Sequence, residues 1–301
     1  GSPRASLEAN FALRRLVGPE NFFAGVSDAE ARAVRRMAEI LRGGPARIAS
    51  VKDVETADAA LVLGEDLTGT APRLALALRQ ASKGAADALA AEKGVPAWLA
   101  NAARVAGEGR KSPIAIVTPL PDALDDVATH ALRRAPHKVA DFGFEVAAAL
   151  EGRRAQKAAG EVAEALAAAA APLVVAGLGL GEPDALEAAA AIAAALGPEA
   201  RIALIPSEAN SLGLAMLGAE GLESAVVALE GDAARTAIVL DADPALRAAP
   251  ETVARLEAAR IVALDHLATP LAERAAVALP VASFAEAAGT WINFEGRAQR
   301  A

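Results

Sequence analysis

The sequence predicts an α/β fold with two mainly parallel, helix-flanked sheets of the Rossmann-like kind. Short apolar runs, each bounded by Gly, Pro or Asp, recur along the 301-residue chain. Longer Ala-rich stretches with apolar residues at helical spacing lie between them. Parallel strands need crossover connections, so strands that alternate with helices favour parallel sheets. Hydrophobic residues make up 54% of the chain, which is enough for a sizeable core.

The first half begins with helices. Ser6 is a candidate N-cap for a first helix, and Ser27 with Glu30 forms a capping box for a second helix over about 27–41. The apolar run 59–63 ends in Gly64 and predicts a buried strand, followed by a helix over 70–81. A second strand is expected over 113–117, with a helix from about Asp122.

The second half repeats the strand–helix pattern. A strand is expected over 172–176, and Gly177, Gly179 and Gly181 lead from it into an Ala-rich helix over 184–196. Further strands are expected over 201–205, 236–240, 260–264 and 275–279. The helical stretch 138–171 separates the two strand-bearing halves. We therefore expect two α/β subdomains, 1–153 and 154–301, the second of them dinucleotide-binding-like.

Composition and charge exclude several classes of function. The net charge is −8, and no Lys/Arg stripe interleaves with aromatic residues, so nucleic-acid binding is not expected. The longest apolar run, 165–180, is broken by Pro172 and Gly177 and is too short to span a bilayer. With no signal peptide at the start, the chain is expected to be soluble and without direct membrane insertion.

Cysteine is absent from the sequence. Iron–sulfur clusters need thiolate ligands and structural zinc sites usually do, so this chain can hold no Cys-ligated cluster, disulfide or thiol nucleophile. The three histidines, His130, His137 and His266, lack HExxH-type spacing. No metal site is expected.

Ligands of open parallel sheets bind beyond the carboxyl ends of the strands, so those loops are the candidate site. The glycines at 177, 179 and 181 suggest a phosphate-binding turn, but Glu182 stands where the third glycine of that fingerprint belongs. Pro183 is typical of an ordinary helix start. The other strand ends are acidic and would repel phosphate, or serve as helix caps: Glu65, Asp66, Asp241, Asp243 and Asp265.

The neighbouring residues do not favour either of two catalytic interpretations, an acid/base pair of carboxylates or a Ser–His–Asp site. Asp241 and Asp243 beside Pro244 look like a turn rather than an acid/base pair. Asp265 and His266 would need a nucleophile, yet Ser207 and Ser211 lie in a polar turn without a nucleophile-elbow motif. Trp98 and Trp291 are expected to be core or interface anchors. No residue is assigned as catalytic, cofactor-binding or metal-binding.

The C-terminal stretch resembles the molybdopterin oxidoreductases. Residues 265–280, DHLATPLAERAAVALP, resemble that family's D-x-x-x-T-x-T-A-x-x-A-D-V-V-L-P run, and residues 289–299, GTWINFEGRAQ, resemble its G-T-x-x-N-x-E-G-R-x-Q signature. Residues 61–66 and 239–244 are similar to its strand-and-G-x-N-P loops. Asp66 and Asp243 replace the usual Asn there, and Leu67 replaces the first Pro. The added negative charge disfavours binding of the pterin cofactor.

Within that family, residues 1–14, 62–68 and 208–213 are similar to the G subunit of the bacterial NADH–quinone oxidoreductases, the respiratory complex I. The resemblance implies a molybdopterin-oxidoreductase-like region without molybdenum, which acts as a scaffold beside the electron path. It implies [2Fe–2S] and [4Fe–4S] clusters elsewhere in the full subunit, other peripheral-arm subunits as partners, and a place on the cytoplasmic side of the plasma membrane.

Three functions remain open at this stage. The first is a structural, non-catalytic fragment of the G subunit that supports electron transfer from NADH to quinone. The second is a fragment of a true molybdopterin-dependent oxidoreductase, such as a formate dehydrogenase or nitrate reductase, which would need a Cys, selenocysteine, Ser or Asp metal ligand. The third is a free-standing α/β protein that binds a small ligand.

Overall fold

The computed structural model describes residues 1–96, 98–231 and 236–300. It divides into two compact units, one made of residues 40–207 and the other of residues 1–39 together with 208–301. Both are α/β with parallel sheets, so the predicted fold class is confirmed. No helix in these described ranges is long and apolar enough to cross a membrane.

The unit of residues 40–207 is built on a six-stranded parallel sheet in the order β1-β6-β5-β2-β3-β4. Its strands are β1 (Arg47–Ile48), β2 (Ala59–Leu63), β3 (Ile114–Thr118), β4 (His130–Arg133), β5 (Pro172–Gly177) and β6 (Arg201–Ile205). Its helices are α3 (Val51–Glu55), α4 (Leu67–Thr70), α5 (Pro72–Ala81), α6 (Gly84–Glu92), α7 (Ala100–Ala106), α8 (Pro136–Leu150), α9 (Lys157–Ala167) and α10 (Asp184–Leu196).

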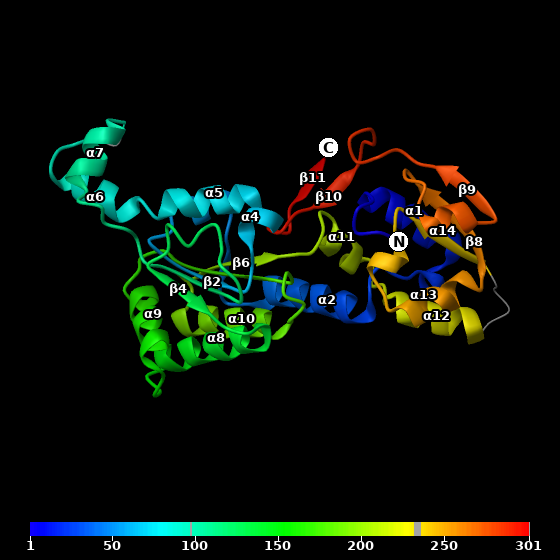
Figure 1. Ribbon diagram of the computed structural model, residues 1–301, viewed down its shortest axis with the longest axis horizontal. Helices are drawn as coiled ribbons and strands as arrows, with labels where there is room; N and C mark the ends of the chain where they lie inside the picture. The colour runs from blue at the N-terminus through cyan, green and yellow to red at the C-terminus, as the bar shows by residue number, and fades with distance from the viewer. Residues whose placement is uncertain (97, 232–235, 301) are drawn as a thin grey trace. The chain divides into compact units, whose positions relative to one another are not determined.

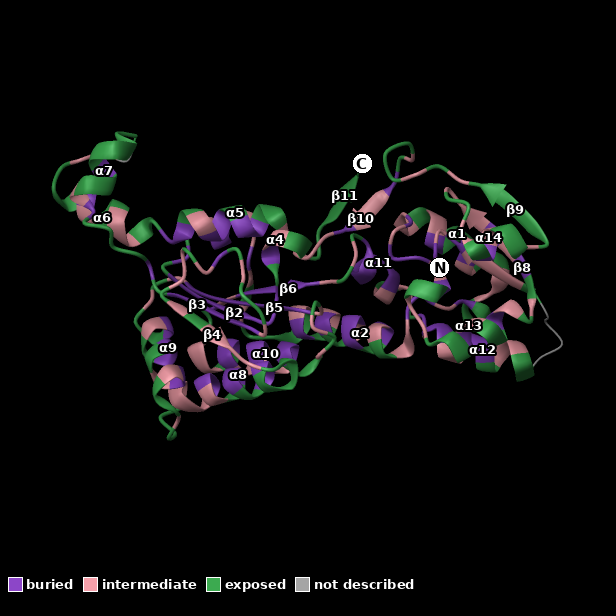
Figure 2. Cartoon of the chain, viewed as in Figure 1, coloured by how far each residue is buried: buried purple, intermediate pink, exposed green. Residues whose placement is uncertain are grey.

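Helices cover both faces of this sheet. Helices α8, α9 and α10 lie on one face and α4 and α5 on the other (Figure 1). Every residue of β2, β3 and β5 is buried (Figure 2). Strands buried on both faces read as continuous apolar runs, which explains why the sequence located these three well.

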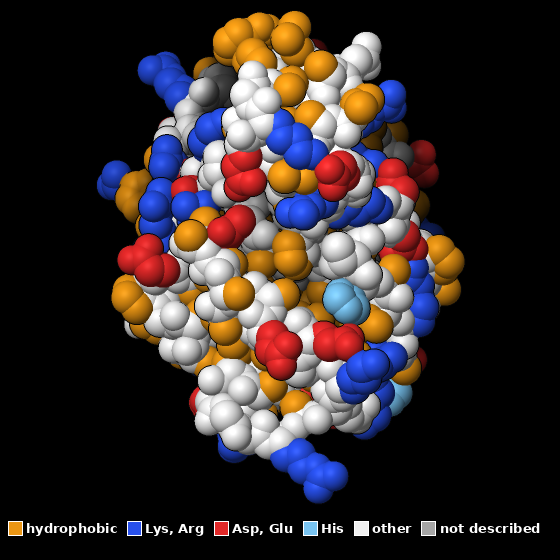
Figure 3. All heavy atoms as spheres, turned by 90° about the vertical axis from the view of Figure 1, so that its left-hand side faces the viewer, with side chains coloured by type: hydrophobic (Ala, Val, Ile, Leu, Met, Phe, Trp, Pro, Cys, Tyr) orange, Lys and Arg blue, Asp and Glu red, His pale blue; other side chains and the backbone are white. Residues whose placement is uncertain are grey.

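Helices α6 and α7 extend away from the six-stranded sheet (Figure 1). Hydrophobic side chains gather over this end of the unit in a space-filling view (Figure 3). Trp98 is 82% exposed there and Val105 is 75% exposed. Trp98 is therefore not a core residue, which corrects one of the two roles expected for it.

The other unit contains a three-stranded parallel sheet, β7-β8-β9, and a two-stranded antiparallel pair, β10-β11. Its strands are β7 (Thr236–Leu240), β8 (Arg260–Asp265), β9 (Val277–Pro280), β10 (Thr290–Ile292) and β11 (Ala298–Arg300). Its helices are α1 (Leu7–Val17), η1 (Pro19–Asn21), α2 (Asp28–Gly43, which continues past residue 39), α11 (Ser211–Met216), α12 (Leu222–Gly231), η2 (Pro244–Leu246), α13 (Pro250–Glu257) and α14 (Pro270–Arg274).

Two buried asparagines connect the segments of this second unit. Asn10 accepts a hydrogen bond from the Ser2 amide at 2.8 Å and donates to the Ser2 carbonyl at 2.8 Å. Asn210 donates to the carbonyl of Ala5 at 2.8 Å and accepts from the amide of Ile292 at 3.0 Å. Asn210 joins two segments that are remote in sequence, whereas Asn10 holds the backbone of residues only a few positions before it. Buried backbone groups need such partners.

Two expectations are wrong. The helix expected from Asp122 does not form: Asp122 accepts from the Leu124 amide at 2.7 Å, Asp125 accepts from the Asp122 amide at 3.0 Å, and a turn leads into β4. The boundary near residue 153 is also misplaced, because β5 pairs with both β2 and β6. Residue 153 lies between two helices of one unit, and strand pairing is not visible in sequence order.

Candidate functional site

The carboxyl ends of β2 and β5 bring the glycine turn next to Glu65. Gly64, with φ +71°, directly follows β2 and precedes Glu65. Glu65 is only 1% exposed. Its carboxylate Oε2 accepts a hydrogen bond from the Gly179 amide at 3.0 Å. Burial raises the pKa of Glu65, and the hydrogen bond from Gly179 opposes that rise.

The turn needs glycine at positions 177 and 179 because the Glu65 side chain fills the space beside them. A Cβ at Gly177 would overlap Glu65 Oε2, and a Cβ at Gly179 would lie 2.9 Å from Oε1. The backbone turn that could cradle a phosphate therefore holds a carboxylate of the protein itself. A phosphate placed at this turn would compete with this carboxylate for the Gly179 amide.

The remaining acidic residues of this strand end act as structural groups. Asp66 is the N-cap of α4 and accepts from the amides of Thr68 at 3.0 Å and Gly69 at 3.2 Å. The Thr68 hydroxyl is the main cause that lowers the pKa of Asp66. Helix α10, which follows the glycine turn, has Asp184 and Glu187 in its first turn. Its N-terminus already has negative charge beside it.

In the second unit, the carboxyl ends of β7 and β8 bring Asp241, Asp265 and His266 together. His266 Nδ1 lies 3.1 Å from Asp241 Oδ1 and 3.6 Å from Asp265 Oδ1. Asp241 adopts a positive φ of +41°, and its pKa is raised, first by burial. Among the described residues, these three side chains could together offer metal ligands, since their atoms lie within 4.8 Å of one another.

Other contacts already use part of this cluster. Arg4 Nη2 lies 3.8 Å from Asp241 Oδ1 and donates to the Asp241 carbonyl oxygen at 3.1 Å. Asp265 Oδ1 accepts from the Leu267 amide at 2.9 Å. Asp243 forms no pair with Asp241 in an acid/base site; it caps η2 by accepting from the Ala245 amide at 3.1 Å. This is the turn role that the sequence indicated.

The serines near the sequence-predicted turn provide no nucleophile. Ser211 is 4% exposed, and its hydroxyl accepts from the Glu208 amide at 3.1 Å. Ser207 is exposed and lies in the other unit. Ser2 donates its hydroxyl proton to the carbonyl oxygen of Asp241 at 2.7 Å, so it also has a structural partner. A Ser–His–Asp site is not assembled from these serines.

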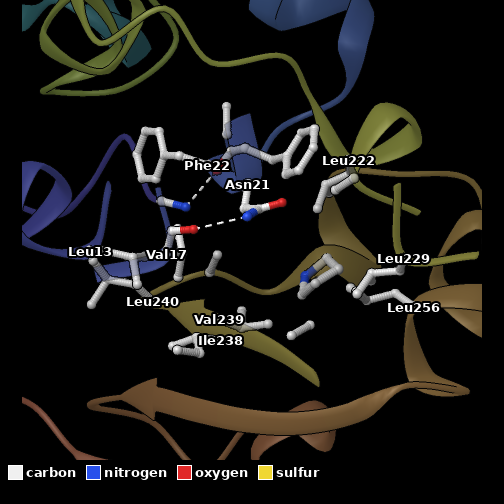
Figure 4. A pocket seen from close by; sticks show the side chains of 18 of the residues that line it. Leu13, Val17, Asn21, Phe22, Leu222, Leu229, Ile238, Val239, Leu240 and Leu256 are labelled. Carbon is white, nitrogen blue, oxygen red and sulfur yellow. Dashed lines mark hydrogen bonds between the residues drawn. The ribbon is translucent and has the colours of Figure 1, made fainter. Parts of the chain in front are cut away.

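The second unit also contains an apolar cavity of about 360 Å³ beside β7, which sequence analysis missed. Side chains from α1 and residues 21–22, from β7, and from α12 and α13 surround it (Figure 4). The labelled lining residues are Leu13, Val17, Asn21, Phe22, Leu222, Leu229, Ile238, Val239, Leu240 and Leu256. All of these residues belong to the same unit. The only sequence signal was the strand 236–240 itself.

The arrangement of strands, turns and helices is shared with a known structure. A chain of the formyltransferase/hydrolase complex (FhcABCD) from Methylorubrum extorquens, crystallised in complex with methylofuran, matches with a TM-score of 0.66. The match covers 99% of this chain and 83% of that one, at 17% sequence identity, and so shows the fold alone. The shared fold is α/β, with parallel sheets flanked by helices.

Sequence relatives narrow this class to one family. The G subunit of NADH-quinone oxidoreductase is 43% identical in Pseudomonas fluorescens, 44% in Pseudomonas putida and 38% in Escherichia coli K12, each match covering 100% of this chain. The chain belongs to the family of NADH-quinone oxidoreductase G subunits, and it spans 35% of the length of these relatives. No family model matches the sequence.

Proposed function

We propose that this chain is a non-catalytic, structural segment of the G subunit. In the complete complex it would support electron transfer from NADH to quinone through iron–sulfur clusters that are ligated outside this segment. Two facts support the second part: the relatives are named for NADH–quinone oxidoreduction, and this segment contains no cysteine to ligate a cluster.

The observation that carries the proposal is the buried Glu65 carboxylate in the glycine turn. Cofactors that bind at the strand ends of such sheets place phosphates on free backbone amides at a helix N-terminus. Here the Gly179 amide is bound to Glu65, and Asp184 and Glu187 add negative charge at the start of α10. The Gly179 amide of this turn is therefore used inside the protein.

Partners and location follow from the proposed membership in the complex. The segment would contact other subunits of the peripheral arm, on the cytoplasmic side of the plasma membrane. The relatives' names support this only to the extent that they place the G subunit in a quinone-reducing complex. Metal-dependent turnover of formate or nitrate is less well supported, because the sequence relatives reported above are all named for NADH–quinone oxidoreduction.

The test is to purify this chain and the matching complete complex side by side. Molybdenum would be measured by mass spectrometry, pterin by fluorescence after oxidation, and NADH and formate oxidation with an artificial electron acceptor. We expect the complex to oxidise NADH. We expect the chain alone to oxidise neither NADH nor formate, and to contain no stoichiometric molybdenum. Turnover by the chain alone, or one molybdenum or pterin per chain, would overturn the proposal.

A further inference from the structure

The apolar cavity of the second unit has the form of a slot along the open edge of β7. Strand β7 is the first strand of its sheet and pairs only with β8 among the described strands. All five residues of β7 line the cavity, so the slot follows its whole length. On the opposite side lie residues 22–25, which also line the cavity.

On the side of this slot, the backbone of β7 has no strand partner among the described residues. The Asp241 amide donates to the Leu264 carbonyl of β8 at 2.7 Å. Backbone groups of a strand point alternately to its two sides, so residues 237, 239 and 241 face β8, whereas the amides and carbonyls of Ile238 and Leu240 face the slot. Such an edge is a template for one more strand.

The opposite side of the slot offers matching groups. Residues 24 and 26 bond away from the slot: the Ala24 amide donates to Glu220 at 2.6 Å, and the Val26 carbonyl accepts from Leu222 at 2.9 Å. Phe23 and Gly25 therefore face the slot. Among the described residues, no acceptor is found for the Phe23 amide.

Gly1 already occupies one end of the slot in strand geometry. Its nitrogen donates to the Phe23 carbonyl at 2.7 Å, and its carbonyl accepts from the Gly25 amide at 2.7 Å. Gly1 thus bonds to Phe23 and to Gly25, the two residues that flank Ala24, as in a parallel β-ladder. On the other side, the Ser2 hydroxyl donates to the Asp241 carbonyl oxygen at 2.7 Å, so residues 1–2 lie between residues 23–25 and the end of β7.

We propose that, in a subunit as long as the relatives, the residues directly before Gly1 form a parallel strand that fills this slot. The strand would run beside β7 and bond to Ile238 and Leu240 on one edge and to Phe23 on the other. Matching the length of β7 takes about five residues, or roughly 17 Å. The proposal rests on family membership and on the geometry of the slot, not on the proposed non-catalytic role.

The apolar lining defines the chemistry of the occupant. The slot is bounded by Val17, Phe22, Leu222, Ile238 and Leu240. A strand enclosed on both faces and both edges is expected to be a continuous apolar run without Pro, Lys or Glu. A charged or proline-containing stretch directly upstream of Gly1 in the reading frame would contradict the proposal before any protein is made.

The biochemical test uses a synthetic peptide with the ten residues encoded before Gly1, added to the purified chain. Because the chain has no cysteine, one engineered cysteine gives an unambiguous disulfide. The variant Ile238→Cys places it in the slot, and Val227→Cys, at a position that is 61% exposed on α12, is the matched control. The peptide has one cysteine at a central position.

We expect the peptide to raise the Tm of the chain by several degrees and to form a disulfide at least tenfold faster with I238C than with V227C. A scrambled peptide of the same composition should do neither. The proposal is overturned if the native peptide leaves Tm unchanged and reacts equally with both variants, or if the scrambled peptide performs as well. The slot would then belong to another occupant, such as the edge strand of a partner or a small apolar molecule.

Discussion

The two sheets of this chain differ in how completely they are enclosed. Strands β2, β3 and β5 of the six-stranded sheet are buried at every residue, and the turn at their ends is filled by Glu65. In the three-stranded sheet, β7 has one buried residue, β9 is exposed throughout, and an apolar slot of about 360 Å³ lies at the edge. The central strands of the six-stranded sheet are enclosed, whereas β7, at the edge of the three-stranded sheet, lies beside the apolar slot.

This difference changes how an empty space in the structure is interpreted. In a sheet of this type a ligand is expected at the strand ends, yet that place is closed in the six-stranded unit. The open space in the other unit lies along a strand edge and not at the strand ends. A cavity beside an unpaired strand edge suits an added strand better than it suits a small molecule.

The largest effect on stability is expected in the six-stranded sheet, at Gly177, where a side chain would not fit. In Gly177→Ala the new Cβ would overlap Glu65 Oε2 and lie 3.0 Å from Ile205 Cβ. We expect a loss of about 3 kcal/mol in the unfolding free energy of this unit, measured by urea denaturation. Gly160→Ala is the control, because that helical position has nothing within 4 Å, and we expect it to stabilise by about 0.5 kcal/mol.

The double variant Gly177→Ala with Glu65→Ala sharpens the same point. If the carboxylate is the main obstacle, the double variant should be more stable than Gly177→Ala alone by about 1 kcal/mol or more. Strictly additive losses would mean that the contact with Ile205 dominates, and that Glu65 does not occupy the space assigned to it.

The second effect tests the hydrogen bonds that hold the unit of the three-stranded sheet together. Asn210→Ala would leave the Ala5 carbonyl and the Ile292 amide without their side-chain partner. Unsatisfied buried groups cost energy, so we expect a loss of about 2 kcal/mol, confined to this unit, in denaturation followed by hydrogen exchange. Asn21→Ala, which removes one exposed bond to Val17, should cost under about 0.5 kcal/mol.

The sequence predicted the elements well where local signals suffice. The runs 201–205 and 236–240 and the helix 184–196 match β6, β7 and α10 residue for residue. The prediction failed where the structure depends on which strands pair. The expected boundary at residue 153 separates β5 from β2, although these two strands pair in one sheet. The helix expected from Asp122 is replaced by turns that Asp122 and Asp125 cap.

The candidate site was predictable in composition but not in arrangement. The acidic strand ends and the missing third glycine were visible in the sequence. The contact between Glu65 and Gly179 was not, because it joins residues 114 positions apart and depends on which strands are neighbours. The slot beside β7 was hidden for the same reason, since it depends on the pairing of residues 22–26.

A smaller effect concerns the pH dependence of the filled turn. Burial raises the pKa of Glu65 above its value of 4.5 in the unfolded chain. Between those two pKa values the folded state holds the proton more tightly, so this group's contribution to stability falls as pH rises through the window. Glu65→Gln keeps an acceptor for the Gly179 amide and has no charge. We expect it to gain up to about 1 kcal/mol relative to the parent chain between pH 4 and pH 7.

Asp66→Asn is the matched control for this pH series. The pKa of Asp66 is lowered, first by the Thr68 hydroxyl, so its contribution is present above its ordinary pKa and lost as pH falls. The two variants should therefore shift the urea midpoint in opposite directions across the series. A midpoint difference between Glu65→Gln and the parent chain that does not change with pH would show that the Glu65 carboxyl is not penalised by its site.

The smallest effect is expected at Asp241, Asp265 and His266, the three side chains beside the three-stranded sheet that could together offer metal ligands. The protein supplies three ligand groups, Arg4 lies 3.8 Å from Asp241 Oδ1, and Asp265 Oδ1 already accepts from Leu267. Structural zinc sites usually have four protein ligands and no cation beside them. We expect 1 mM zinc to change the Tm by less than about 1 °C in both the parent chain and His266→Ala, as measured by calorimetry.

The zinc concentration is high enough for this measurement to decide between the two units. A site with a Kd of about 10 µM would stabilise the unit by about 2.7 kcal/mol in 1 mM zinc, which calorimetry would detect easily. An increase of several degrees that disappears in His266→Ala would show that Asp241, Asp265 and His266 bind metal. In that case the three-stranded unit, and not the six-stranded one, would hold a functional strand-end site, because its strand ends would still be open to a ligand while Glu65 closes those of the other sheet.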